Sequence, residues 1–301
     1  MAISLTESIK RNKTTRSQLY WNTFVRIPAQ VINLAISIVV ARILMPKDFG
    51  IMGITMMLIG YANLFTNFGL GDAIIQKQIR DKKVLNSIFF FNLVISSILV
   101  ITFLFFAEMI SEFFNTPECK TAIQIMSLVF IINAIAIVPG SILRRNMDFK
   151  ALAIIEVLQS VLMSVITLFL AWRGYGYKAL IYGQLIPTIV RSIALCYKSW
   201  YLPFIYYNHS LMKEIYSFGG WNLLRIQLLF ASQHVDRFIA GKFLGPVLLG
   251  FYDKALSLST TPNNAITMHI NSVMFSSFSS HKDDLVQLQE SFKKGMALIA
   301  L

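Results

Sequence analysis

The chain contains two similar stretches, WNTFVRIPAQVINLAISIVVARILMPKDFG at residues 21–50 and WNLLRIQLLFASQHVDRFIAGKFLGPVLLG at residues 221–250. They share identical residues at the start of each stretch and at the turn that ends it: Trp21 and Trp221, Asn22 and Asn222, Leu44 and Leu244, Pro46 and Pro246, Gly50 and Gly250. Tryptophan at membrane interfaces and Pro or Gly at helix ends are common, so chance is an alternative explanation. The repeat otherwise indicates a duplicated element that begins each half of the protein.

The composition is typical of a membrane protein, because 55% of the residues are apolar and only 14% are charged. Apolar stretches recur at about the 20 residues that a helix needs to cross a bilayer. They predict spans over residues 18–44, 51–69, 84–107, 121–140, 151–172, 178–197, 213–240 and 247–275, and a ninth that begins at residue 291. The expected fold class is therefore an all-α polytopic membrane protein. Because residue 301 falls within an apolar run, we expect the chain to be part of a longer polypeptide.

Six spans separate the two copies of the repeat, so both copies cross the membrane in the same direction, as in two parallel lobes. We expect an amphipathic cytoplasmic N-terminus over 1–17, a six-helix lobe over 18–200, a cytoplasmic connection over 201–212 and the start of a second lobe over 213–301. The connections on the N-terminal side hold sixteen Lys and Arg and the opposite ones seven, which predicts a cytoplasmic N-terminus. No connection is long enough to fold as a nucleic-acid reader, despite the net charge of +12.

Each copy of the repeat carries one polar stripe on an otherwise apolar helix, at 100° per residue. The stripes hold Asn22, Arg26, Gln30, Asn33 and Ser37 in the first span, and Arg225, Ser232 and Asp236 in the seventh. An arginine at the centre of a span costs about 2.5–3.5 kcal/mol, so Arg26 and Arg225 are expected to face a hydrated cavity or a partner. Snorkelling to the headgroups is the alternative, and it suits Arg26 better than the more deeply placed Arg225.

Two further spans have polar faces. They hold Asn63, Thr66 and Asn67 in the second span, and Ser257, Thr261, Asn264 and Asn271 in the eighth. Hydrogen bonds between helices, worth about 0.6 kcal/mol each, would explain some of these residues. Their concentration in spans one, two, seven and eight favours a central cavity between two lobes.

For each group of charged residues near the span ends, the sequence allows either a functional role or simple pairing of opposite charges. Glu156 is a candidate for a coupling role, or it pairs with a nearby cation such as Lys150. The neighbouring charges of Asp236 and Arg237, and of Asp253 and Lys254, either gate the outer mouth or neutralise each other.

Other chemistry is not indicated. Cys119 and Cys196 fall at opposite ends of the topology, so they are expected to be unpaired thiols. The four histidines lack metal-ligand spacing and no phosphate-binding loop is present, so we expect neither a metal site, nor a cofactor, nor an enzyme.

Four stretches carry a resemblance to a known family: ARILMPKDFGIMG at 41–53, FGLGDAIIQ at 68–76, VPGSILRRNMDFKALA at 138–153 and DRFIAGKFLGPVLLGFYDKA at 236–255. In their order and spacing the chain resembles the polysaccharide-transporter branch of the multidrug/oligosaccharidyl-lipid/polysaccharide (MOP) exporter superfamily, the O-antigen and exopolysaccharide flippases. The resemblance implies a MATE-like fold of two six-helix bundles that face each other across a cavity. It also implies that undecaprenyl-diphosphate-linked oligosaccharide is moved to the outer leaflet of the bacterial inner membrane.

Under this resemblance Arg26 and Arg225 are expected to bind the diphosphate, because the arginine fork suits paired oxygens. Hydrogen-bonding groups for the substrate would come from Asn22, Gln30, Asn33, Asn63, Asn67, Ser232, Asn264 and Asn271. Further expected partners are the lipid bilayer and a polysaccharide polymerase or other assembly proteins. Two alternatives stay open: a cation-coupled exporter of small amphipathic molecules on the same fold, and a non-transporting scaffold in a polysaccharide-assembly complex.

Overall fold

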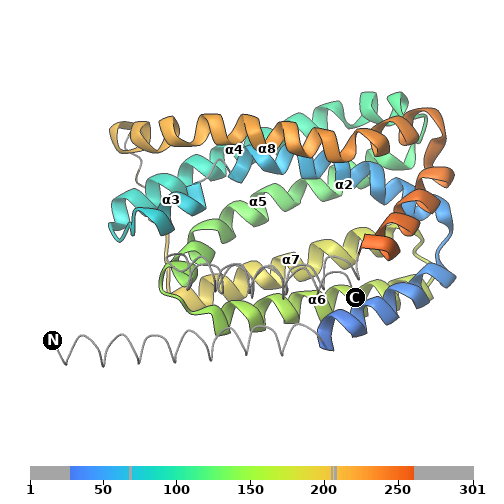
Figure 1. Ribbon diagram of the computed structural model, residues 1–301, viewed down its shortest axis with the longest axis horizontal. Helices are drawn as coiled ribbons and strands as arrows, with labels where there is room; N and C mark the ends of the chain where they lie inside the picture. The colour runs from blue at the N-terminus through green and yellow to red at the C-terminus, as the bar shows by residue number, and fades with distance from the viewer. Residues whose placement is uncertain (1–27, 68–69, 205, 207–208, 261–301) are drawn as a thin grey trace, which may run out of the picture. The chain divides into compact units, whose positions relative to one another are not determined.

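The computed structural model describes residues 28–67, 70–204, 206 and 209–260 of the chain, and every regular element within them is a helix. The first helix is Pro28–Ile43. It is followed by α2 (Pro46–Asn67), α3 (Leu70–Gln76), α4 (Lys82–Phe113), α5 (Glu118–Arg145), α6 (Phe149–Trp172), α7 (Tyr177–Ser199) and α8 (His209–Phe243), shown in Figure 1. A further helix covers residues 245–260. The chain divides into two compact units, residues 1–250 and residues 251–301.

Five of the described helices are long and apolar enough to cross a membrane: α2, α4, α5, α6 and α7. This confirms the predicted all-α membrane fold class. The second predicted span, 51–69, is followed at once by the short helix α3 (Leu70–Gln76), which the sequence analysis did not anticipate. Helix α8 begins at His209, within the range 201–212 that was predicted as a connection.

Helices α4 and α6 begin where an aspartate side chain caps a free backbone N–H group. Asp81 precedes α4 and its carboxylate accepts a hydrogen bond from the Lys83 N–H at 2.8 Å. Asp148 does the same for α6, with the Ala151 N–H at 3.2 Å. Basic residues lie in the last turns of α5 and α7, where they complement the helix dipole.

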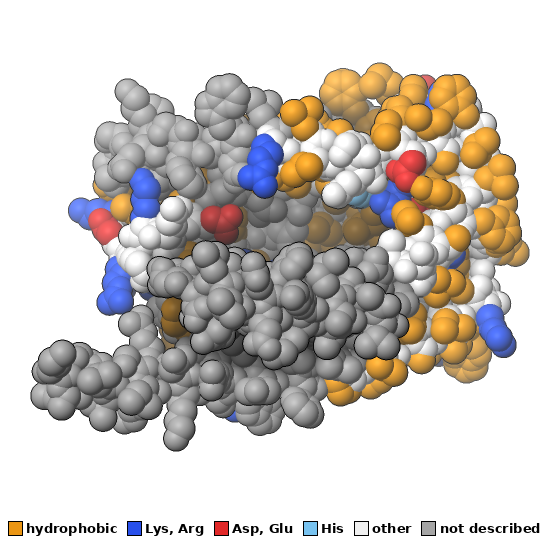
Figure 2. Space-filling model, viewed as in Figure 1, with side chains coloured by type: hydrophobic (Ala, Val, Ile, Leu, Met, Phe, Trp, Pro, Cys, Tyr) orange, Lys and Arg blue, Asp and Glu red, His pale blue; other side chains and the backbone are white. Residues whose placement is uncertain are grey.

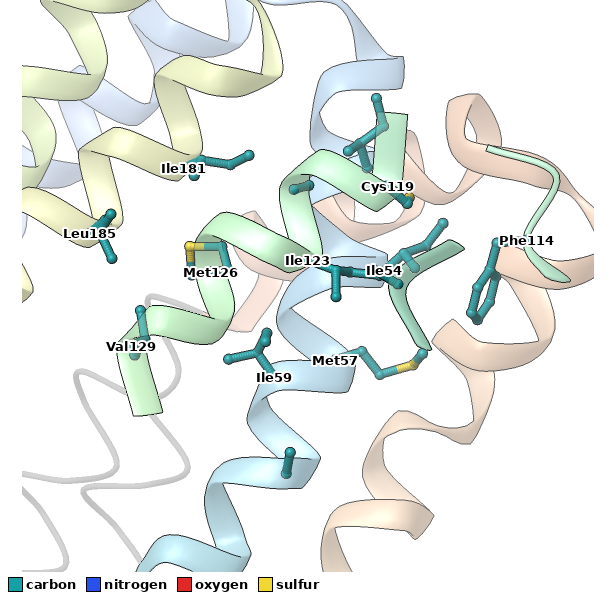
Figure 3. Packing of buried hydrophobic residues seen from close by; sticks show 14 of the residues in the cluster. Ile54, Met57, Ile59, Phe114, Cys119, Ile123, Met126, Val129, Ile181 and Leu185 are labelled. Atoms are coloured by element: carbon teal, nitrogen blue, oxygen red, sulfur yellow. The ribbon is translucent and has the colours of Figure 1, made fainter. Parts of the chain in front are cut away.

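Helix α5 lies at the centre of the first unit and packs against α2, α4 and α7. A core cluster forms where these elements meet (Figure 3). Its members include Ile54 and Met57 from α2, Ile123 and Phe130 from α5, and Ile181 from α7. Apolar packing on several sides makes α5 the element on which the other helices are positioned.

Helices α6 and α7 run antiparallel and side by side (Figure 1), and a glycine allows them to approach closely. A Cβ atom on Gly183 would lie 1.9 Å from the Thr167 Oγ1, so α7 needs glycine at this position. Within α5, Pro139 cannot donate a backbone hydrogen bond to the Ile135 carbonyl, and the Cys196 thiol of α7 lies 4.0 Å from that oxygen. Cys196 and Cys119 are both free thiols, as expected.

Candidate functional site

A polar pocket of about 430 Å³ opens among α2, α3, α5 and α7. Its lining comprises Asn63, Gly71, Asp72, Asn133, Ala136, Ile137, Gly140, Ser141, Arg144 and Arg191. All four helices belong to the range predicted as the first lobe. The described lining of the pocket therefore lies within the first unit.

One face of α5 forms most of the pocket wall. Asn133, Ile137, Gly140 and Arg144 recur at intervals of three or four residues, which places them along one side of the helix. Small residues on this face leave room for the pocket. Helix α3 lies close by, because a Cβ atom on Gly71 would come within 2.9 Å of the Ser141 Oγ.

The pocket combines two guanidinium groups with one carboxylate. Arg191 extends from α7 and is half-buried, whereas Arg144 and Asp72 are exposed. The charge of Glu156, half-buried on α6, acts on Arg191, and so does that of Arg144. A charged side chain within a membrane helix is costly unless it is paired or functional, so Arg191 is the residue of greatest interest.

Neutral polar groups add hydrogen-bonding capacity to the pocket. The Asn63 side-chain oxygen accepts a hydrogen bond from the Thr66 hydroxyl at 2.9 Å. Asn133 lies half-buried in the pocket wall. An anion with attached hydroxyl groups fits this combination of guanidinium and amide groups.

The surface around the α3 end of the unit is basic. Figure 2 shows several Lys and Arg side chains at the end of the face that carries α3 in Figure 1. Arg145, at the end of α5, donates a hydrogen bond to the Ile79 carbonyl in the segment between α3 and α4. An anionic ligand would be attracted to this end of the molecule.

The structure brings few of the predicted site residues together. Asn63 lies in the polar pocket, and Glu156 acts on Arg191 at its wall. Asn22, Arg26, Asn264, Asn271 and the side chain of Asn67 lie outside the described part of the chain. Their predicted roles stay predictions.

Asn33 is engaged within the first unit. Its amide nitrogen donates to the Ser160 hydroxyl of α6, and its oxygen accepts from the Ser164 hydroxyl at 2.6 Å. These are hydrogen bonds between helices. Gln30, one turn earlier on the same helix, is exposed.

The predicted residues of α8 lie on its surface. Arg225 is exposed, and the exposed Ser232 hydroxyl donates to the Leu229 carbonyl at 2.8 Å. The Asp236 carboxylate accepts from the Arg237 N–H at 2.7 Å. In the second unit, Asp253 and Lys254 are half-buried and within electrostatic reach of each other. None of these observations tests the proposed binding or gating roles.

Of the polar lining residues the sequence analysis named only Asn63, and it missed Asp72, Asn133, Ser141, Arg144 and Arg191. A signal was available for Arg191, because it lies inside the predicted span 178–197 and the cost argument applied to Arg26 applies to it equally. Asp72 and Asn133 gave no comparable signal, since each is one polar residue next to an apolar run.

Comparisons with known proteins agree with this architecture. Residues 39–301 match the family model described as polysaccharide biosynthesis protein. The succinoglycan biosynthesis transport protein ExoT of Rhizobium meliloti (strain 1021) is 25% identical over 276 residues, 90% of this chain and 55% of that protein. The lipopolysaccharide biosynthesis protein WzxC of Escherichia coli (strain K12) is 20% identical over 295 residues, 97% of this chain and 59% of that protein.

The teichuronic acid biosynthesis protein TuaB of Bacillus subtilis (strain 168) is 22% identical over 244 residues, 80% of this chain and 50% of that protein. The chain thus spans about half to three fifths of the length of these relatives. Among solved structures, an inward-facing multidrug resistance MATE family transporter of the MOP superfamily matches with a TM-score of 0.60 at 18% identity, covering 92% of this chain and 70% of that one. The shared fold is therefore MATE-like. The family model covers most of this multi-pass bacterial membrane protein, and the chain belongs to the polysaccharide biosynthesis protein family.

Proposed function

We propose that this chain belongs to a transporter, not an enzyme, that moves undecaprenyl-diphosphate-linked oligosaccharide across the bacterial inner membrane. The oligosaccharide would serve the synthesis of O-antigen, capsule or exopolysaccharide. The observation that carries the proposal is the polar pocket with Arg144 and Arg191, set among helices that are otherwise apolar enough to span a membrane. A cytoplasmic N-terminus would place the α3 end of the unit, with its basic surface, on the side where the substrate is made.

The chemistry of the pocket suits this substrate. A diphosphate requires cations, and each guanidinium can offer two parallel N–H donors to its oxygens. The amides of Asn63 and Asn133 would hydrogen-bond to sugars, while the polyprenyl chain remains in the lipid. Hydrogen bonds to a charged group contribute about 1.5–3 kcal/mol, so losing one arginine should weaken binding roughly ten- to a hundredfold.

The test uses the full-length protein in liposomes that contain a fluorescent lipid-linked oligosaccharide. Arg191→Ala and Arg144→Ala should each slow movement of the lipid between leaflets at least tenfold, with Arg191→Lys retaining part of the activity because its charge remains. Arg173→Ala is the matched control, because Arg173 is an exposed arginine just after α6 and outside the pocket. Unchanged movement in both pocket variants would reject the assignment of the pocket.

The arginines predicted from the repeat are tested in cells. Arg26→Ala and Arg225→Ala should abolish surface polysaccharide in cells without loss of the protein, if those arginines contact the diphosphate. Normal polysaccharide in both variants would reject their role. Efflux of small amphipathic molecules by the wild-type protein, without movement of the lipid-linked sugar, would favour the cation-coupled exporter. If the protein shows neither of these activities, the scaffold alternative is favoured.

A further inference from the structure

The two copies of the repeated turn meet in space. Pro46 begins α2 and Pro246 lies in the first turn of helix 245–260, and each is followed four residues later by glycine. A Cβ atom on Gly50 would lie 1.7 Å from the Pro246 carbonyl oxygen. A Cβ atom on Gly250 would lie 1.8 Å from the Pro46 carbonyl oxygen. No side chain fits at either position.

The contact is reciprocal. Each glycine faces the proline carbonyl of the other copy, which is the pattern that a two-fold axis between the turns would produce. The main chains touch directly, so the fit depends on the absence of two Cβ atoms. The glycine shared by the two copies therefore has the same physical cause at both positions.

Apolar packing surrounds the contact. Leu249, next to Gly250, is fully buried and belongs to the same core cluster as Ile54, Phe114 and Cys119. Gly241 of α8 lies among these side chains, because a Cβ atom there would be 3.3 Å from Ile54 and 3.4 Å from both Leu249 and Phe114. Separation of the two turns would remove Leu249 from the cluster.

The contact lies far from the polar pocket. Gly50 is near the start of α2 and Asn63, which lines the pocket, is near its end, so helical rise places them about 20 Å apart. One end of α2 is therefore tied to the second copy of the repeat while the other end borders the pocket.

We propose that the two Pro-x-x-x-Gly turns form a latch that holds the two copies of the repeat together at the end of the unit opposite α3. Opening of the latch separates the start of α2 from residues 246–250 and exposes the core beneath. The latch is a property of the protein without substrate, so it is independent of the proposed transport activity.

The buried thiol of Cys119 can report opening of the latch. The chain has only two cysteines, and Cys119 is fully buried in the cluster under the contact. In a variant in which every cysteine except Cys119 is replaced by serine, a maleimide can react only at Cys119, at a rate that follows local opening. The measurement uses the full-length protein in liposomes.

Gly50→Ala and Gly250→Ala should each speed labelling of Cys119 about tenfold or more, because the added methyl group forces the turns apart. The double variant should label only slightly faster than either single variant, since both changes break the same contact. Met45→Ala, on an exposed side chain before α2, is the control and should label as slowly as wild type. Labelling of both glycine variants at the control rate would overturn the proposal.

Hydrogen exchange separates a latch from a general loss of folding. Exchange should rise at residues 46–54 and 246–250 in the glycine variants and stay unchanged in α6 and α7. A rise across α6 and α7 as well would mean that the turns support the whole unit, and it would also overturn the proposal.

Discussion

Replacement of Asn33 by leucine tests whether its amide serves the fold or the substrate. Asn33 bonds to Ser160 and to Ser164, one helical turn apart on α6, so it fastens the first helix to α6. Hydrogen bonds between membrane helices contribute about 0.6 kcal/mol each, so the two together are worth about 1.2 kcal/mol. Asn33→Leu keeps the size of the side chain and removes both bonds. We therefore expect Asn33→Leu to lower the free energy of unfolding by about 1–2 kcal/mol. This figure includes the cost of leaving the two serine hydroxyls without their partner.

The measurement is reversible unfolding in mixed micelles, followed by circular dichroism, for Asn33→Leu, for Ser160→Ala with Ser164→Ala, and for all three changes together. The thermodynamic cycle should return a coupling energy of about 1.2 kcal/mol between Asn33 and the serine pair. Gln30→Leu is the matched control on the exposed part of the same helix and should stay within about 0.5 kcal/mol of wild type.

A coupling energy below about 0.3 kcal/mol would refute the structural role. The same variants decide the functional question in the full-length protein. If Asn33 contacts sugar, Asn33→Leu should reduce lipid movement while the serine variant retains it. If Asn33→Leu and the serine variant reduce lipid movement equally, Asn33 serves the fold alone.

Two further predictions concern packing and pH. Gly183→Ala should destabilise the α6–α7 pair by about 1–3 kcal/mol, because its Cβ would lie 1.9 Å from the Thr167 Oγ1. A second change, Thr167→Ala, should recover only part of the loss, since the Thr167 Cβ would still be 3.0 Å away, and calorimetry would measure both. The Tyr201 phenol donates to the Asn86 side-chain oxygen, and burial raises the pKa of Tyr201 above its usual value. The folded state therefore favours neutral Tyr201, so its contribution is complete below about pH 10 and is lost as the pH rises further. In Tyr201→Phe the free energy of unfolding should depend less steeply on pH between about pH 9 and 11 than in wild type. An identical slope of this free energy against pH in both proteins would contradict the assignment.

The sequence was sufficient for α2, α4, α5, α6 and α7, because the length of an apolar run is fixed by the bilayer that it crosses. The sequence did not predict which helices pack against one another. Periodicity predicts that the polar residues of the first span share one face, but it does not say what that face meets. For Asn33 the neighbour is α6. The break after α2 also escaped detection, since α3 continues the apolar pattern.

The repeated turns show a second limit. Pro46 with Gly50, and Pro246 with Gly250, could be explained one copy at a time by the usual preferences of helix ends. Their contact depends on two segments that are two hundred residues apart, so no local rule predicts it. Arg191 was overlooked for a different reason, since the cost of a charge in a span was applied only to the two copies of the repeat.

The charge of Glu156 bears on anion binding in the polar pocket, because it acts on Arg191. This charge partly neutralises a guanidinium that the proposed substrate also needs. An anion entering the pocket would compete with Glu156 for the same cation. Glu156 would therefore influence anion binding through its effect on Arg191, without direct contact with the anion.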